Sequence, residues 1–412
     1  MALEPCIQGF KEGCRPYLSI DSTVLTGRWN GCLASATTLD GHNWMFPVAF
    51  GLFQSESEEN WEWFMRQLHR SIGDVSPLAI STDACKGLAN AVRTVFPHAE
   101  QRECHAHLML NLYRHYSGTV YRYMWTAARA YKPESYKFFM DKIHAENSDF
   151  AVYLERNHSH LWMRSAFNPT IKCDYINNNL AETVNNWVKD SKDLPVHMLM
   201  DTIRGMLMRL IKVRRDIGDR LRGHILPAVI QQINQRSRGL GYLRVGESND
   251  HSYEVRDLSR NGLRHVVKID SRECSCLEWQ HTGKPCPHAL IFLVHKRTLP
   301  HLDQYVSEYF SLAKFRATYA GAVPPCTDQS QWPVVQLPFK LCQPNVKRGK
   351  GRPRMSRFKN FMEKQGMPFS GSKKGKNRCK QCKCIGHRAA GCPLNGPKPR
   401  YEVFACMIFI YN

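Results

Sequence analysis

Long apolar runs are missing from this sequence of 412 residues. None reaches the roughly 18 residues that a membrane-spanning helix needs, and the opening MALEPCIQGFKEGCRPY lacks the charged-then-apolar layout of a signal peptide. The apolar ending VFACMIFIYN is too short to anchor the chain in a bilayer. We therefore expect no membrane partner, and we expect the 16 cysteines to be reduced thiols of a nuclear or cytosolic protein.

Acidic residues are nearly absent from residues 343–400, where 17 Lys and Arg accompany one acid, Glu363. Such a segment favours a polyanion, and nucleic acid is the usual one. Around Gly351-Arg352-Pro353 the chain resembles extended segments that enter a narrow minor groove. A nuclear-localisation signal or a solvated tail remains an alternative. The candidate DNA contacts are Lys347, Arg348, Lys350, Arg352, Arg354 and Arg357.

A first group of cysteines and histidine has zinc-ligand spacing. In CSCLEWQHTGKPCPH, Cys274 and Cys276 lie two apart, and Cys286 and His288 repeat this spacing. Thiolates and imidazole are the donors that tetrahedral zinc takes. Four donors so close in sequence argue against a set of buried free cysteines and predict a structural zinc site.

A second group, CKQCKCIGHRAAGC, supplies Cys379, Cys382, His387 and Cys392. So short a loop cannot fold without metal, so zinc binding and folding should be coupled. The spacing is that of a CCHC zinc knuckle, a module that binds single-stranded nucleic acid partly by stacking bases on aromatic side chains. No aromatic residue lies within this copy, which favours phosphate attraction or protein contact over base stacking.

The first hundred residues alternate between strand and helix patterns. LSID leads to Asp21, CLASATTLD and WMFPVAFGLF flank a turn at Asp40-Gly41, and PLAIST leads to Asp83. Amphipathic helices are expected from the spacing in SESEENWEWFMRQLHRSI and KGLANAVRTVF. This region is therefore predicted to be α/β. Residues 109–240 read as helices, and SYEVRDL and RHVVKID as a hairpin turning at Asn261-Gly262.

Two acids follow predicted strands, and a third lies in a predicted helix. Asp21 and Asp83 would meet at one sheet edge, and Glu182 in LAETVNNWV could complete a site for two divalent metals that act on a phosphodiester. The chemistry alone leaves other interpretations open. Asp83 could cap the following helix, and Glu182 could be an ordinary surface acid.

The motifs together resemble the plant Mutator-like transposase family. They are Asp21-Ser-Thr, LDGHNWMFPVAFGLFQSESEENWEWF, STDACKGLANAVRTVFPHAEQRECHAHL and KCDYINNNLAETVNNWV, followed by a SWIM-type C-x-C…C-x-H finger and a CCHC knuckle. The resemblance implies an RNase H-like core with a helical insertion and a catalytic triad of Asp21, Asp83 and Glu182 that uses Mg²⁺ or Mn²⁺. It also matches Cys104 and His107 to a family C-x-x-H motif, whose alternative is two core residues at a strand end.

The expected domains follow from these assignments. They are the core, first part (1–108), a helical insertion (109–170), the completion of the core (171–240), the SWIM finger (250–300), a Pro/Gly/basic linker (301–375), the knuckle (376–396) and a tail (397–412). Family members usually carry an N-terminal DNA-recognition domain, which we expect to be missing here. The first hypothesis is a nuclear transposase or its derivative that cleaves and transfers DNA strands, and the resemblance allows a homo-oligomer. The alternatives are a non-catalytic DNA-binding regulator and a zinc-finger adaptor.

Overall fold

The computed structural model describes residues 1–27, 29, 31–83, 85–116, 118–158, 160–247, 251–296 and 299–332. They belong to one compact unit that contains residues 1–335. The zinc knuckle, the basic segment with the six candidate DNA contacts and the C-terminal tail lie outside the described residues. Of the helices in the described part, none has the length and apolar character that a bilayer crossing demands.

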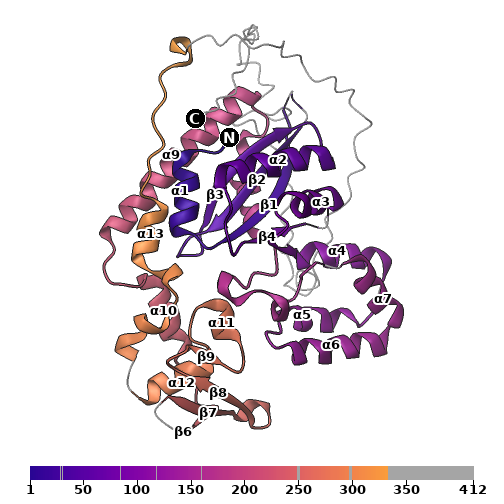
Figure 1. Cartoon of the computed structure of the whole chain (residues 1–412), viewed down its shortest axis with the longest axis vertical. Coiled ribbons are helices and arrows are strands. Elements are labelled where there is room, and N and C mark those ends of the chain that lie inside the picture. Colours follow the sequence, from indigo (N-terminus) through magenta and orange to yellow (C-terminus); the bar gives the residue numbers. More distant parts are fainter. Residues whose placement is uncertain are drawn as a thin grey trace, which may run out of the picture. The chain divides into compact units, whose positions relative to one another are not determined.

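A five-stranded mixed sheet lies at the centre of the first domain (Figure 1). Its strands are β1 (Tyr17–Val24), β2 (Cys32–Leu39), β3 (Met45–Phe53), β4 (Ala79–Thr82) and β5 (Glu100–Glu103). Their order is β3-β2-β1-β4-β5. The first three strands are antiparallel, whereas β1, β4 and β5 run parallel. The strand-like runs predicted from the sequence are thereby confirmed, including the turn at Asp40-Gly41.

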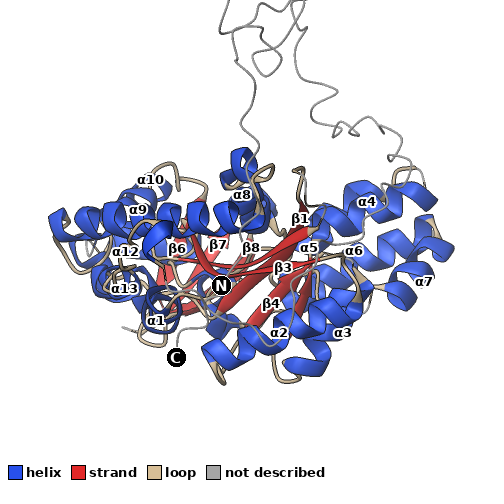
Figure 2. Cartoon of the chain, turned by 90° about the horizontal axis from the view of Figure 1, so that it is seen from above, coloured by secondary structure: helices blue, strands red, loops and turns tan. Residues whose placement is uncertain are grey.

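Helices cover both faces of this sheet. Figure 2 shows α8 (Asn179–Trp187) on one side and α2 (Glu58–Ile72) and α3 (Lys86–Val95) on the other. Helix α2 begins where the Oγ of Ser57 accepts the backbone N–H of Asn60, a standard N-cap. Its predicted apolar face, with Trp61, Phe64, Met65 and Leu68, is buried in the core.

A separate helical segment follows β5. Its helices are α4 (His105–His115), α5 (Tyr121–Arg129), α6 (Pro133–Glu146) and α7 (Ser148–Asn157), and they lie together in Figure 1. They share a hydrophobic cluster of their own around Leu112, Met124, Phe150 and Trp162, distinct from that of the sheet. A second hydrophobic cluster is what an inserted helical domain needs, although the predicted boundaries 109–170 remain a prediction.

The C-terminal half of the described chain contains long helices and a second sheet. Helix α9 (Val196–Arg220) and helix α10 (Pro227–Arg236) precede an antiparallel sheet in the order β6-β7-β8-β9. Its strands are β6 (Leu243–Glu247), β7 (Ser252–Asp257), β8 (Leu263–Lys268) and β9 (Glu273–Cys274). The turn between β7 and β8 contains Asn261 and Gly262, both at positive φ, so the predicted hairpin is confirmed. Helices α11 (Glu278–Thr282) and α12 (Pro287–His295) follow.

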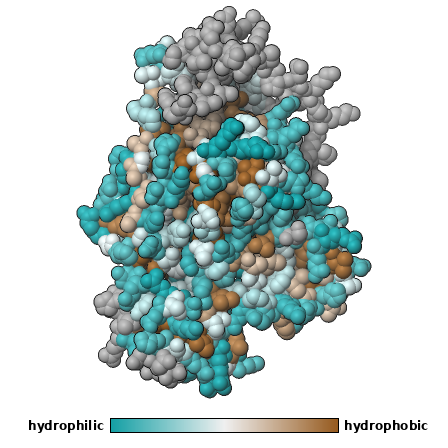
Figure 3. Space-filling model, viewed as in Figure 1, coloured by the Kyte–Doolittle hydropathy of each residue, from teal (hydrophilic) through white to brown (hydrophobic). Residues whose placement is uncertain are grey.

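The prediction of a linker from residue 301 is wrong for its first part, which is folded. Residues 299–323 fold back onto the core through 3-10 turns and helix α13 (Leu312–Thr318). Phe310, Phe315 and Tyr319 are each 1% exposed or less, because apolar residues at helical spacing bury one face. The Pro- and Gly-rich composition that suggested a linker begins only after this helix. On the face drawn in Figure 3, hydrophilic side chains surround smaller hydrophobic patches, as expected once such residues are buried.

The N-terminal helix α1 (Glu4–Gly13), which the sequence analysis did not predict, packs closely on α13. A Cβ at Gly13 would lie 2.5 Å from the backbone N of Thr318 and closer still to the Oγ1 of that residue. We therefore expect Gly13→Ala to destabilise the protein by about 1–3 kcal/mol through overpacking. Urea denaturation would measure this change.

The matched control is Gly205→Ala in helix α9. A Cβ at Gly205 would meet nothing within 4 Å. The substitution should therefore stabilise the protein by roughly 0.5–1 kcal/mol through helix propensity alone. A destabilisation of similar size at both positions would contradict the close packing of α1 on α13.

Candidate zinc centre and acidic site

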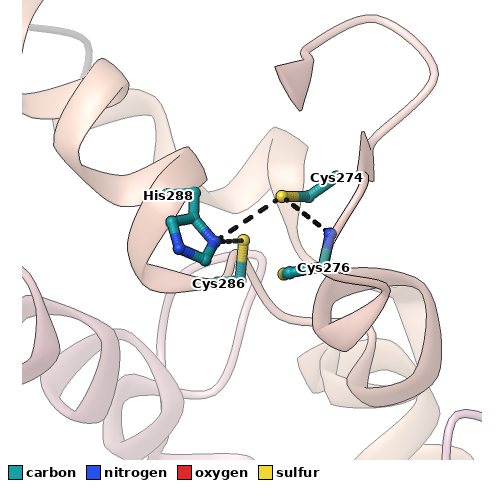
Figure 4. A group of neighbouring side chains, drawn as sticks. All are labelled: Cys274, Cys276, Cys286 and His288. Atoms are coloured by element: carbon teal, nitrogen blue, oxygen red, sulfur yellow. Dashed lines mark hydrogen bonds between the residues drawn. The ribbon is translucent and has the colours of Figure 1, made fainter. Parts of the chain in front are cut away.

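The predicted zinc ligands Cys274, Cys276, Cys286 and His288 converge (Figure 4). All four ligand atoms lie within 4.8 Å of one another, and no other group of three or more His, Cys, Asp or Glu in the described chain does so. The Nδ1 of His288 is 3.7 Å from the Sγ of Cys274 and 3.8 Å from that of Cys286. Tetrahedral zinc with Zn–S near ~2.3 Å and Zn–N near ~2.0 Å spaces its donors about 3.6 Å apart, so these atoms fit one ion.

Local structure aims each of the four ligands. Cys274 ends β9, which pairs with β8, and the backbone N–H of Cys276 donates to the Sγ of Cys274 across 3.5 Å. Leu277 then adopts a left-handed conformation that turns the chain into α11. Cys286 is the N-cap of α12, and Pro287 sets the first helical turn that holds His288. His281, the other histidine of this stretch, is not part of the cluster and lies in α11 against the ring of Tyr131.

The three thiols lie close enough to shift one another's pKa values. Hydrogen bonds from Cys274 and Cys286 hold the pKa of Cys276 far below its usual range. The hydrogen bond to Cys276 in turn raises the pKa of Cys274 to about 12, and burial raises the pKa of Cys286. A divalent cation at the centre would replace these protons, since zinc binds the thiolate form.

Asp21 and Asp83 lie on neighbouring strands, but Asp21 does not end its strand as predicted, because β1 continues to Val24 against β2, whereas Asp83 directly follows β4. In the parallel register Tyr17 pairs with Ala79 and Ser19 with Ser81, so Asp21 and Asp83 occupy corresponding positions two residues further on. Ser19 faces α8, because its Oγ receives the backbone N–H of Ala181, and Asp21 shares that face by the two-residue alternation of a strand. Burial, together with the charge of Asp83, raises the pKa of Asp21 to about 6. Burial also raises the pKa of Asp83.

Known domain families match the region of the two acids and the region of the predicted zinc ligands. The MULE transposase domain matches residues 17–111, and the SWIM zinc finger matches residues 265–291. The chain carries a MULE transposase domain followed by a SWIM zinc finger. The resemblance to the plant Mutator-like transposase family is thereby confirmed. The Arabidopsis thaliana protein FAR1-RELATED SEQUENCE 6 is 31% identical over 90 residues, which cover 22% of this chain and 13% of that protein.

The Cys104 and His107 pair lies beside the acids of the MULE domain. The pairing of β4 with β5 ends at Thr82 and Glu103, and the backbone N–H of Cys104 donates to the backbone O of Thr82 across 2.8 Å, directly before Asp83. A hydrogen bond with Cys104 raises the pKa of His107 to about 9 against the opposing effect of burial, and the charges of Asp83 and Asp21 add to the rise. These contributions place the His107 ring close to Cys104, Asp83 and Asp21.

Glu182 lies on α8, one turn before the residue that contacts Asp21. That residue is Asn185, whose amide donates to the Oδ2 of Asp21 across 3.2 Å. Glu182 itself is exposed, while Leu180, Ala181 and Val184 are buried. Residues three apart on a helix are neighbours, so Glu182 borders the site. Its carboxylate and those of Asp21 and Asp83 do not form a group whose oxygens all lie within 4.8 Å of one another.

The sequence analysis missed the residue that joins these elements, Asn178. Its side-chain amide accepts a hydrogen bond from Ser19 and donates to the backbone O of Ile20 across 3.1 Å. Its backbone N–H donates to the Sγ of Cys104 across 3.1 Å. The run of three asparagines directly before the helix of Glu182 is the signal that could have indicated it.

Proposed function

We propose that this chain is a transposase-derived nuclear DNA-binding protein. In this proposal the MULE domain is RNase H-like, and Asp21, Asp83 and Glu182 form the triad that cleaves and transfers DNA strands. The observation that carries it is the position of the acids. Asp21 and Asp83 are at matching positions of adjacent parallel strands, on the face that α8 covers. Glu182 lies on that helix, one turn from the residue bonded to Asp21.

The residues of this site suit a divalent cation. Two half-buried carboxylates with raised pKa values favour a bound cation, which stabilises their charged forms. Mg²⁺ or Mn²⁺ would take oxygen ligands from Asp21, Asp83 and Glu182. A bound ion would activate a water molecule or a DNA 3′-hydroxyl as the nucleophile and would stabilise the leaving oxygen.

The other residues of the site would act on substrate and ligands directly. A protonated His107 beside both acids would balance part of their negative charge. The amide of Asn185 would keep the Oδ2 of Asp21 in place. Outside the described residues, the cations of 343–400 would add phosphate contacts whose strength falls steeply with salt.

The non-catalytic regulator remains the second candidate, and one observation favours it. The α8 side chain that reaches Asp21 is a neutral amide, and Glu182 is exposed. A protein that retained the fold and lost cleavage would keep Asn178 and Asn185 as structural links between β1 and α8. Its DNA affinity would then be independent of Asp83.

Nicking of supercoiled plasmid with Mg²⁺ or Mn²⁺ separates these candidates. We expect nicking by the wild-type chain, and background levels from Asp83→Asn and Glu182→Gln, because each removes a carboxylate ligand. The control is Glu59→Gln, an exposed acid on α2, which should nick as the wild type does. Equal nicking by wild type and Asp83→Asn would exclude the catalytic proposal. DNA binding by every variant without nicking by any would support the regulator.

A further inference from the structure

A cavity of about 290 Å³ lies apart from both the zinc centre and the acids. Seven parts of the chain line it. They are the turn before β1 with Arg15, the turn between β2 and β3 with Asn43, Tyr131 after α5, the segment 164–175, helix α10, residues 278–284 of the SWIM finger and Phe310. The MULE domain, the helical segment and the finger therefore meet at this cavity.

The lining has an excess of positive charge. It contains five cationic and two acidic side chains. Both acids are already paired, Asp174 with Arg164 at 2.9 Å and Glu278 with Arg236 at 2.5 Å. Arg15, Lys172 and Lys284 remain, and within the described chain no carboxylate forms an ion pair with any of them. The cavity thus holds about three positive charges without counter-charges.

Arg15 is the most buried of these three cations, at 3% exposure. One nitrogen of its guanidinium, Nη2, donates to the backbone O of Asp40 and to the Oδ1 of Asn43, whereas Nε has no partner. The carboxylate of Asp40 instead accepts the hydroxyl of Tyr319. A buried cation without a counter-ion is costly. An anion in the cavity would offset that cost.

Residues with positive φ, Lys172 itself and Gly283 before Lys284, position the two lysines at the cavity. Lys172 has a φ of 54°, a left-handed conformation that a non-glycine residue rarely adopts and that often marks a ligand clamp. Its Nζ donates to the backbone O of Gln280 across 2.7 Å. Gly283, at φ 70°, lets the finger loop approach so closely that a Cβ there would lie 3.3 Å from Lys172. Lys284 follows, and its Nζ donates to Gln232 across 3.0 Å.

We propose that this cavity binds a small phosphate-bearing anion, which joins the SWIM finger to the MULE domain. Arg and Lys side chains are the usual hydrogen-bond donors to phosphate. The net charge of the cavity, near +3, exceeds what a single chloride ion would neutralise. Duplex DNA fits less well, because Arg15 is too deeply buried for the backbone phosphate of a stiff duplex to reach. The hydroxyls of Thr282 and Tyr131 also line the cavity, but they already donate to the backbone O of Glu278 and to Asp174, so the anion would take its hydrogen bonds from the cations.

The test uses the full zinc-loaded chain and inorganic pyrophosphate at constant ionic strength. Thermal unfolding should shift upward and saturate with pyrophosphate, because a ligand of the folded state stabilises it by mass action. Lys172→Gln and Lys284→Gln should each weaken the apparent affinity about tenfold, the value of one charged hydrogen bond. Lys172→Arg should restore it. Lys137→Gln, at an exposed position of α6, removes the same charge and should leave the affinity unchanged.

Three outcomes would overturn the proposal. One is the absence of a saturable shift in the wild type. Another is an equal loss of affinity in Lys137→Gln, which would reveal attraction to net charge alone. The third is protection by a short DNA duplex but not by pyrophosphate, which would assign the cavity to backbone contact. Zinc content is measured in each sample, so a variant that has lost the finger is recognised.

Discussion

Cys286→Ser is expected to remove one equivalent of zinc and to unfold the SWIM finger. Cys286 is fully buried, is one of the four predicted zinc ligands and is the N-cap of α12. Structural zinc contributes roughly 10–16 kcal/mol to the folding of small zinc modules, far more than the core of so small a sheet supplies. Loss of hydrogen-exchange protection in β6 to β9 and in α12, together with metal analysis, would show the effect.

The exposed thiol of Cys326 offers the matched control. Cys326→Ser makes the same chemical change outside the cluster and should leave both zinc content and exchange protection unaltered. Retention of all zinc by Cys286→Ser would refute the assignment of the ligands. Loss of zinc without loss of protection would show that the finger folds on its packing alone.

Arg102→Met is expected to destabilise the MULE domain by about 3–5 kcal/mol, since it breaks a buried ion pair by removing one partner. Arg102 is 1% exposed, and its Nε donates to Glu100 across 2.6 Å. Its Nη1 donates to the backbone O of Cys173 across 2.6 Å, which links β5 to the segment before α8. The guanidinium also stacks 3.8 Å from the ring centre of Phe167. Urea denaturation of the zinc-loaded protein would measure the loss.

Arg66→Met tests the same substitution at an exposed ion pair. Arg66 pairs with Glu62 one turn away on α2, and its side chain is 56% exposed. Such pairs contribute little, so the change should cost under about 0.5 kcal/mol. Similar losses at Arg66 and Arg102 would mean that the buried network adds nothing beyond an ordinary surface pair.

Features set by short-range sequence were predictable. The turn at Asp40-Gly41, the amphipathic helix α2 and the zinc spacing of the SWIM finger all depend on residues close together in the chain. The positions of Asp21 and Asp83 required only that two strands be parallel neighbours. In each case the residue type and its local spacing determined the geometry.

Features that depend on distant contacts were missed. Helix α1 is short, and its apolar residues find partners in β3 and in α13, which lies some 300 residues away in the sequence. The role of Asn178 depends on its hydrogen bonds with β1 and with Cys104, which lie 74 residues or more away from it in the sequence. The placement of Asn185 rather than Glu182 against Asp21 depends on the rotation of α8, which a helical pattern alone does not fix.

The return of residues 299–323 to the N-terminal helix has a consequence for biosynthesis. Lys314 donates to the backbone O of Glu12, and Arg215 of α9 donates to the backbone O of Tyr319. During translation, the first strands would therefore leave the ribosome long before the residues that cover α1 exist. Contacts so far apart in sequence form slowly, and partly covered domains expose apolar surface meanwhile. The nascent chain should accordingly depend on chaperones until about residue 320 has emerged.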